Sequence, residues 1–141
     1  MHCHLGKERP RNTAPGTSEA IHQAKREDAK LIVIDPVKTY FAEMADIWLQ
    51  IKPGHDGQLA MAMLHEIFAK GFCDDGFVKK YCIGFDALKS AARAYPAERV
   101  AARLRLDTDK IGQAARLYAA TMKSHTLSGC WWCSPAIRRQ P

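Results

Sequence analysis

Two short apolar runs, each followed by a turn and an acid, constrain the fold of this chain more than any other feature. The first, Leu31–Ile34, is rich in β-branched residues and is followed directly by Asp35 and Pro36. The second, Ile47–Ile51, is followed by a Pro-Gly turn and then by Asp56. These runs predict two buried strands, the first covered on both faces and ended by its proline. In open α/β sheets ligands bind at the carboxyl ends of the strands, so the pair predicts a nucleotide site.

Apolar periodicity and turn residues predict the other elements. A short strand is expected at residues 1–5, followed by a polar loop that extends to Gly16. The expected helices are one capped by Thr17 or Ser18 and ending near Asp28, then Thr39–Ala45, Asp56–Lys70, Asp74–Tyr81, Phe85–Ala94, Ala97–Leu104 and Thr108–Ala120. This order predicts an α/β fold with a mainly parallel sheet in a βαβ, Rossmann-like unit and additional C-terminal helices.

The longest expected helix and the second strand also predict a core. Asp56 is expected to be the N-cap of the helix and Gly71 to close it. The apolar stripe of that helix is Leu59, Met63, Leu64, Ile67 and Phe68. In the last helix Asp107 is the expected cap, and the stripe is Ile111, Ala114, Ala115 and Tyr118. Alternation places Ile47, Leu49 and Ile51 on one face of the second strand and Trp48 on the other.

Composition indicates one ordinary globular domain. The chain has 141 residues, of which 47% are apolar and 26% charged, enough for a single core. A net charge of +6 is spread along the whole chain, which is typical of a solvated surface and disfavours a nucleic-acid site. No apolar run approaches the roughly 20 residues that span a bilayer, and no signal peptide is visible. Five irregularly spaced cysteines favour a reducing compartment.

Each of the two acids has a structural and a functional interpretation. Asp35 follows a strand as the ribose-binding acid of a dinucleotide fold does, but with Pro36 it equally marks the end of a strand. The loop before it has only Gly6 and Gly16, so the G-x-G-x-x-G fingerprint of NAD sites is absent. Asp56 is placed either to accept two hydrogen bonds from the N1–H and N2–H₂ edge of guanine or to cap a helix. Residue patterns leave both alternatives open.

Several segments in a fixed order resemble the molybdopterin oxidoreductase family, the enzymes of the dimethyl-sulfoxide-reductase type. They are Pro10–Pro15, Ala29–Pro36, Ala45–Gly57, Ala60–His65, Asp75–Val78, Tyr81–Asp86, Tyr95–Ala101 and Ile111–Ala119. Together they cover roughly residues 5–120. The resemblance implies a bis(molybdopterin guanine dinucleotide) cofactor that carries molybdenum or tungsten.

The resemblance also implies which residues hold the cofactor, and none of them is catalytic or binds the metal. The guanosine end would be lined by residues that follow the two strands, namely Asp35, Pro36, Lys38, Thr39, Gly54, His55 and Asp56. Within the family's Pro-Gly-Thr-Asp turn, Asp56 takes the place of the acid that binds guanine. Gly6, Asn12 and Thr13 would belong to the loop that faces the pyrophosphate.

Some positions depart from the family pattern. Val37 replaces the usual Arg, so a cationic contact is lost, and Lys38 is the residue that can partly replace it. His55 replaces the common Thr. The loop Gly6–Pro10 lacks the usual Asn before its proline, which weakens the predicted phosphate contacts.

By the same resemblance, the chain is an internal piece of a longer enzyme. In complete members the iron–sulfur cysteines and the metal-binding residue lie upstream, and a second dinucleotide-binding region lies downstream. Residues 1–121 would be an incomplete cofactor-binding α/β domain and residues 122–141 a non-matching tail. For the tail we hypothesise a frameshift, gene decay or an assembly error ahead of Ser128. We expect the chain alone to be catalytically silent.

Its expected partners are the cofactor and the rest of the parent enzyme or its electron-transfer subunits. The cytoplasm is the expected compartment, with the periplasm as the alternative if an export signal lies upstream.

A second hypothesis is a free-standing nucleotide-binding or protein-interaction module without redox activity. Cys130 and Cys133 have the spacing of a thiol-redox motif, but no strand and helix are predicted around them. Together with the residues His2-Cys3-His4 they supply zinc-ligand types, from opposite ends of the chain.

The remaining cysteines and histidines have simpler interpretations. Cys73 and Cys82 flank a short expected helix and are predicted to be packing residues. His22 and His65 are predicted to be surface or hydrogen-bonded polar residues.

Overall fold

The computed structural model describes residues 17–120. Its elements are α1 (Thr17–Arg26), β1 (Ile32–Ile34), α2 (Tyr40–Met44), β2 (Ile47–Leu49), α3 (Asp56–Ala69), α4 (Asp75–Tyr81), α5 (Phe85–Ala92), α6 (Ala97–Leu104) and α7 (Thr108–Ala120). The predicted strand at residues 1–5, the phosphate-facing loop with Gly6, Asn12 and Thr13, and the motifs beyond residue 120 lie outside the described residues.

The two strands pair in parallel, as predicted. Ile32 faces Ile47, Val33 faces Trp48 and Ile34 faces Leu49. Parallel neighbours need a crossover connection, and α2 provides it between the end of β1 and the start of β2. The described residues therefore form a mixed α/β fold with one small parallel sheet, while the finer Rossmann-like assignment stays a prediction.

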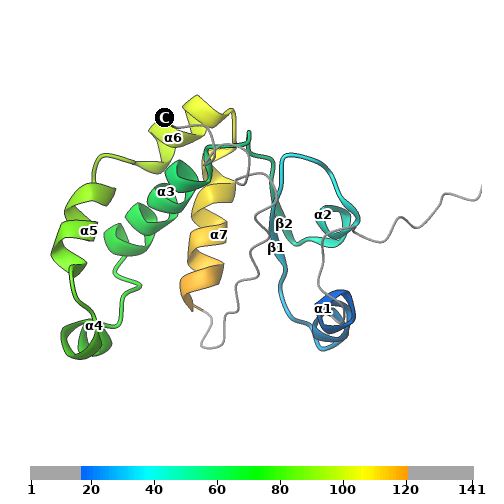
Figure 1. Ribbon diagram of the computed structural model, residues 1–141, viewed down its shortest axis with the longest axis horizontal. Helices are drawn as coiled ribbons and strands as arrows, with labels where there is room; N and C mark the ends of the chain where they lie inside the picture. The colour runs from blue at the N-terminus through cyan, green and yellow to red at the C-terminus, as the bar shows by residue number, and fades with distance from the viewer. Residues whose placement is uncertain (1–16, 121–141) are drawn as a thin grey trace, which may run out of the picture.

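The sheet separates two groups of helices. In Figure 1, α1 and α2 lie on one side of β1 and β2, and α3 to α7 lie on the other. His22 of α1 packs against Tyr40 and Phe41 of α2, with ring centroids 5.6 and 6.1 Å apart, so these two helices contact each other directly. At the far end of the molecule, Phe68 of α3 meets Phe85 of α5 edge to face at 5.3 Å.

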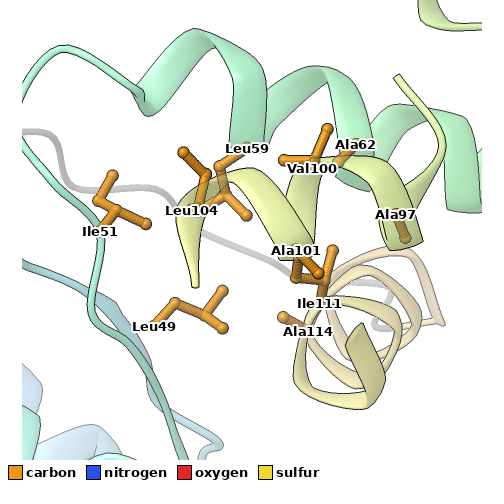
Figure 2. Packing of buried hydrophobic residues seen from close by; sticks show 10 residues of the cluster. All are labelled: Leu49, Ile51, Leu59, Ala62, Ala97, Val100, Ala101, Leu104, Ile111 and Ala114. Carbon is orange, nitrogen blue, oxygen red and sulfur yellow. The ribbon is translucent and has the colours of Figure 1, made fainter. Parts of the chain in front are cut away.

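One apolar cluster joins β2 to the larger group of helices. Figure 2 shows its side chains converging from β2, from Ile51 two residues after that strand, and from α3, α6 and α7. Its most deeply buried large side chains are Leu49, Leu59 and Ile111. The predicted alternation in the second strand is confirmed, because Leu49 and Ile51 are buried in this cluster and Ile47 packs against it.

The prediction that both faces of the first strand are covered is wrong for the described residues. No residue of β1 is fully buried, and Ile34 is 44% exposed. The reason is topological. The helices that form the core pack against β2, and β1 has only β2 as a strand neighbour in the part of the chain described here.

The two predicted helix stripes hold at their core-facing positions. In α3, Leu59 is buried and Met63 packs against the core, while Leu64, Ile67 and Phe68 are half-buried. In α7, Ile111, Ala114 and Ala115 are buried as predicted, but Tyr118 is 44% exposed.

Capping residues mark several helix ends. Asp107 accepts a hydrogen bond from the Asp109 N–H at 2.9 Å, and Asp74 accepts one from the Phe77 N–H at 2.9 Å. Gly71 adopts a left-handed φ of +68° after α3, and the Phe72 N–H returns to the Ile67 carbonyl at 3.0 Å. This is the expected glycine closure of a helix.

Two smaller predictions need correction. Cys82 is exposed, so it is not a packing residue, whereas Cys73 is half-buried. Burial, followed by the charge of Asp75, raises the pKa of the Cys73 thiol and disfavours its reactive thiolate. His65 is half-buried, but its Nδ1 atom lacks a hydrogen-bond partner among the described residues.

Within the described residues no helix is long and apolar enough to cross a membrane.

Candidate functional site

The loop after β1 is a tightly hydrogen-bonded turn. The Asp35 N–H donates to the Leu49 carbonyl at 3.2 Å, which continues the strand pairing to the last residue before Pro36. The Asp35 carboxylate then accepts a hydrogen bond from the Val37 N–H at 2.8 Å through Oδ1. This is the local turn that an aspartate at a strand end forms readily. Asp35 therefore has a structural role, and its Oδ2 atom makes no hydrogen bond within the described residues.

The same loop leads directly into α2. The Thr39 N–H donates to the Val37 carbonyl at 2.9 Å, and Thr39 is the N-cap of the helix. Its Oγ1 accepts a long hydrogen bond, 3.4 Å, from the Ala42 N–H. Lys38, between these bonded residues, is exposed and extends a cation from the loop.

Two side chains from the second strand hold the loop from the side. Trp48 Nε1 donates to the Asp35 carbonyl at 3.1 Å, and Gln50 Nε2 donates to the Pro36 carbonyl at 3.0 Å. Both residues lie on the face of β2 opposite to the one that Leu49 and Ile51 bury in the core. Neither was predicted as a site residue. The sequence signal that could have identified them is their spacing. Trp48 and Gln50 both carry N–H donors and lie two positions apart at the end of a predicted strand that is followed by a turn.

The loop after β2 is a second turn. The His55 N–H closes it by donating to the Lys52 carbonyl at 3.3 Å. Gly54 has a φ of +83°, which a residue with a side chain rarely adopts, so the glycine is required by the turn itself. His55 Nδ1 lies 3.2 Å from the Pro53 carbonyl and holds the imidazole against its own loop.

Asp56 begins α3 and is not the cap of that helix, so this prediction is wrong. The N-cap is His55, whose carbonyl accepts from the Gln58 and Leu59 N–H groups at 3.0 and 3.1 Å. The turn that ends at His55 fixes where the helix starts and places Asp56 in its first turn. The Asp56 carboxylate is exposed and makes no side-chain hydrogen bond or ion pair with any residue in the described range.

These two loops lie at the same edge of the sheet. Because β1 and β2 are parallel, both carboxyl ends meet there, and Figure 1 shows the chain leaving that end toward α2 and toward α3. The predicted residues Asp35, Pro36, Lys38 and Thr39 belong to one loop, and Gly54, His55 and Asp56 to the other. The edge offers carboxylate acceptors, a lysine cation and the unpaired N–H groups at the start of α3. Groups of these kinds can bind a nucleotide and its phosphates. Among the described residues no group of three or more His, Cys, Asp or Glu side chains could hold a metal ion.

The opposite edge of the sheet holds a charge cluster that the sequence did not single out. Asp46, just before β2, accepts hydrogen bonds from Lys25 Nζ at 2.8 Å, the Leu31 N–H at 2.8 Å and Lys30 Nζ at 3.3 Å. The bonds from Lys25 and Leu31 lower the pKa of the Asp46 carboxyl to about 2. Asp46 thus ties the end of α1 to the starts of both strands.

Two cavities lie elsewhere on the surface, and none of the predicted cofactor-binding residues lines them. A cavity of about 250 Å³ between α3 and α5 is lined by His65, Phe68, Lys89 and Arg93, among others. A second, of about 400 Å³, lies between α4 and α5. The candidate cofactor residues that follow the two strands lie outside both cavities and are exposed or half-buried.

Comparison with known proteins gives consistent matches. The family model for molybdopterin oxidoreductase matches residues 7–129. Acetylene hydratase of Syntrophotalea acetylenica is 40% identical over 96 residues, which are 68% of this chain and 13% of that protein. Formate dehydrogenase H of Escherichia coli is 32% identical over 120 residues, 85% of this chain and 17% of the relative.

A solved structure agrees with these matches. Acetylene hydratase from Pelobacter acetylenicus superposes with a TM-score of 0.69 at 37% sequence identity, over 72% of this chain and 14% of that one. Across these relatives the chain spans between 13% and 17% of the longer protein.

Proposed function

This chain belongs to the molybdopterin oxidoreductase family, whose members use a molybdenum or tungsten pterin cofactor, and we propose that its two loops bind the guanosine and pyrophosphate part of a molybdopterin guanine dinucleotide. The matched relatives include a hydratase and a formate dehydrogenase. Their names share no substrate, which favours a role for the common segment in holding the cofactor.

The carboxylate of Asp56 is the observation that carries the proposal. It is exposed in the first turn of α3, it does not cap the helix, and it has no partner among the described side chains. Guanine presents two parallel donors, N1–H and N2–H₂, and a carboxylate has two oxygens at matching separation. A charged acceptor left unpaired at a ligand-binding edge is suited to this recognition.

The other loop supplies the remaining contacts of the proposed site. The Oδ2 atom of Asp35 is the acceptor for a ribose hydroxyl, because Oδ1 is already bonded to the Val37 N–H. Lys38 is exposed beside it and provides a positive charge for the phosphates. Gly6, Asn12 and Thr13 are proposed to complete the phosphate contacts from the preceding loop.

The bound cofactor supplies electron-transfer or related chemistry at its metal, and this chain orients the opposite, nucleotide end. Asp35, Lys38 and Asp56 hold charge and hydrogen bonds at fixed positions, while Gly54 and His55 shape the turn that presents Asp56. We propose that the metal site, the iron–sulfur centre and any electron-transfer subunit belong to the rest of a longer parent enzyme.

Guanosine diphosphate, which reproduces the proposed nucleotide half, provides the test with the 141-residue chain. Binding should raise the free energy of unfolding by about 1.4 kcal/mol at ten times Kd. Adenosine diphosphate should bind more weakly, because adenine lacks the N1–H and N2–H₂ donors. Urea unfolding at several concentrations of each nucleotide measures both effects.

Asp56→Asn should abolish the preference for guanosine, because an amide cannot accept both bonds. Asp75→Asn is the matched control, since Asp75 is likewise the first residue of a helix, α4, away from the proposed site. Equal protection by the two nucleotides, or a guanosine preference that survives in Asp56→Asn, would contradict the proposal.

A further inference from the structure

We propose that Trp48 and Gln50 are positioning residues, which hold the loop after β1 in the conformation that receives the nucleotide. This inference rests on the proposed function, because the loop is the one assigned to the guanosine end. Neither side chain needs to touch the ligand. Both act through the backbone of Asp35 and Pro36, which they contact directly.

The two hydrogen bonds fix consecutive peptide groups. Trp48 Nε1 binds the carbonyl of Asp35 at 3.1 Å, and Gln50 Nε2 binds the carbonyl of Pro36 at 3.0 Å. A peptide group is planar, so holding two successive carbonyls fixes both planes that flank Pro36. The proline ring already restricts its own φ, and little freedom is then left between Asp35 and Val37.

The placement of the two donors follows from the sheet. Trp48 pairs with Val33, two residues before Asp35, and Gln50 lies two residues after Trp48 on the same face. Leu49, between them, is buried on the opposite face in the core. A strand anchored in the core therefore presents two donors along the side of the loop.

This arrangement also limits the position of the Asp35 carboxylate. Its Oδ1 accepts from the Val37 N–H, and the Thr39 N–H closes on the Val37 carbonyl. Loss of either side-chain donor would free a carbonyl to rotate, and the turn that fixes Oδ2 and Lys38 would loosen. The expected result is weaker nucleotide binding with the fold retained.

Two conservative substitutions remove the donors separately. Trp48→Phe keeps an aromatic ring but lacks the N–H group, and Gln50→Leu replaces an exposed side chain with one of similar size. Gln113→Leu, at an exposed position on α7, is the matched control. All variants are made in the 141-residue chain, and their unfolding in urea verifies that they fold.

Two measurements test the inference. Hydrogen exchange without ligand, at the Val37 and Thr39 amides, should become about three- to tenfold faster in each variant, the range expected for one lost hydrogen bond. The Kd for guanosine diphosphate should rise by a similar factor, and further in the double variant. Gln113→Leu should change neither quantity.

The outcomes separate this inference from the function on which it rests. If the wild type binds guanosine diphosphate and the double variant binds equally well, the positioning role is overturned and the proposed function stands. Faster amide exchange with an unchanged Kd for guanosine diphosphate would also overturn the positioning role, because the two hydrogen bonds would then stabilise the loop without affecting binding. If the wild type does not bind the nucleotide, both proposals fall together, whatever the exchange rates show.

Discussion

The two ends of the small parallel sheet use their aspartates in opposite ways. At the amino end, Asp46 accepts hydrogen bonds from two lysines and a backbone N–H, and its pKa is lowered to about 2. At the carboxyl end, Asp35 uses one oxygen for a single backbone N–H, and Asp56 uses neither within the described residues. At the amino end the carboxylate is hydrogen-bonded within the chain, whereas at the carboxyl end carboxylate oxygens remain without partners among the described residues.

This difference indicates how to separate structural from functional charges in a chain of this kind. A carboxylate whose partners come from several elements contributes to the fold, because its loss leaves those partners unsatisfied. A carboxylate that is exposed and unpaired at a ligand-binding edge contributes little to the fold and is available for recognition. Substitutions at the two ends should therefore affect different measurements.

The largest effect on stability is expected for Asp46→Asn. The substitution removes the charge that attracts Lys25 and Lys30, and we expect it to lower the free energy of unfolding by about 1–2 kcal/mol. The estimate is modest because 26% of the Asp46 side chain is exposed, and solvent screens the ion pairs. Urea unfolding at pH 7 measures it.

The lysines provide an internal control for that substitution. Lys25→Met should cost more than Lys30→Met, because the Lys25 ion pair is shorter, 2.8 against 3.3 Å, and Lys30 is 62% exposed. Equal costs for the two lysines would contradict this ranking, and costs near zero for both would show that the ion pairs add little to stability.

A somewhat smaller, graded effect is expected as the pH falls. The pKa of Asp46 is about 2 in the folded chain against an ordinary value of 3.8, so the folded state holds the charged form more strongly. Its contribution to stability is complete above about pH 4 and is lost as the pH falls toward 2. Wild type and Asp46→Asn should therefore differ clearly at pH 5, still differ at pH 3 and converge only as the pH approaches 2. A difference that stays constant over this range would exclude Asp46 as its source.

The smallest effect is expected for Asp56→Asn in the absence of ligand. The variant loses only the favourable interaction of a charge with the start of α3, about 0.5 kcal/mol. Asp75→Asn, at the same position of α4, should cost a similar amount. A loss above about 2 kcal/mol for Asp56 alone would mean that its carboxylate is structural, and the contrast between the two edges would fail.

The sequence predicted those features that depend on neighbouring residues. Alternation in Ile47–Ile51 and the cap at Asp107 are local patterns, and both are confirmed. The first residue of α3, Asp56, was right, but its N-cap was wrong by one residue. The turn at Gly54 decides the cap, and an aspartate in the first turn has the same sequence pattern as one at the cap. Helix stripes were right at the buried core positions, such as Leu59 and Ile111, whereas Tyr118 is 44% exposed.

Contacts across the sheet were beyond sequence reasoning. The bonds from Trp48 and Gln50 to the loop after β1 depend on the register of the two strands, which no single segment encodes. The exposure of Ile34 likewise depends on which strand the helices cover. The cofactor residues themselves were named through family resemblance, and their role stays a proposal.

Helix α3 links the proposed site to the interior of the molecule. Asp56 stands exposed at its start, and Leu59, three residues later, is 1% exposed in the apolar core. A nucleotide held at the first turn would therefore restrain the same helix that the core restrains from the other side. By thermodynamic reciprocity, nucleotide binding and packing of the core then favour each other. Binding of the nucleotide opposes loosening of the core, and substitutions that leave cavities in the core weaken nucleotide binding. Nucleotide affinity and the free energy of unfolding would therefore be coupled through α3.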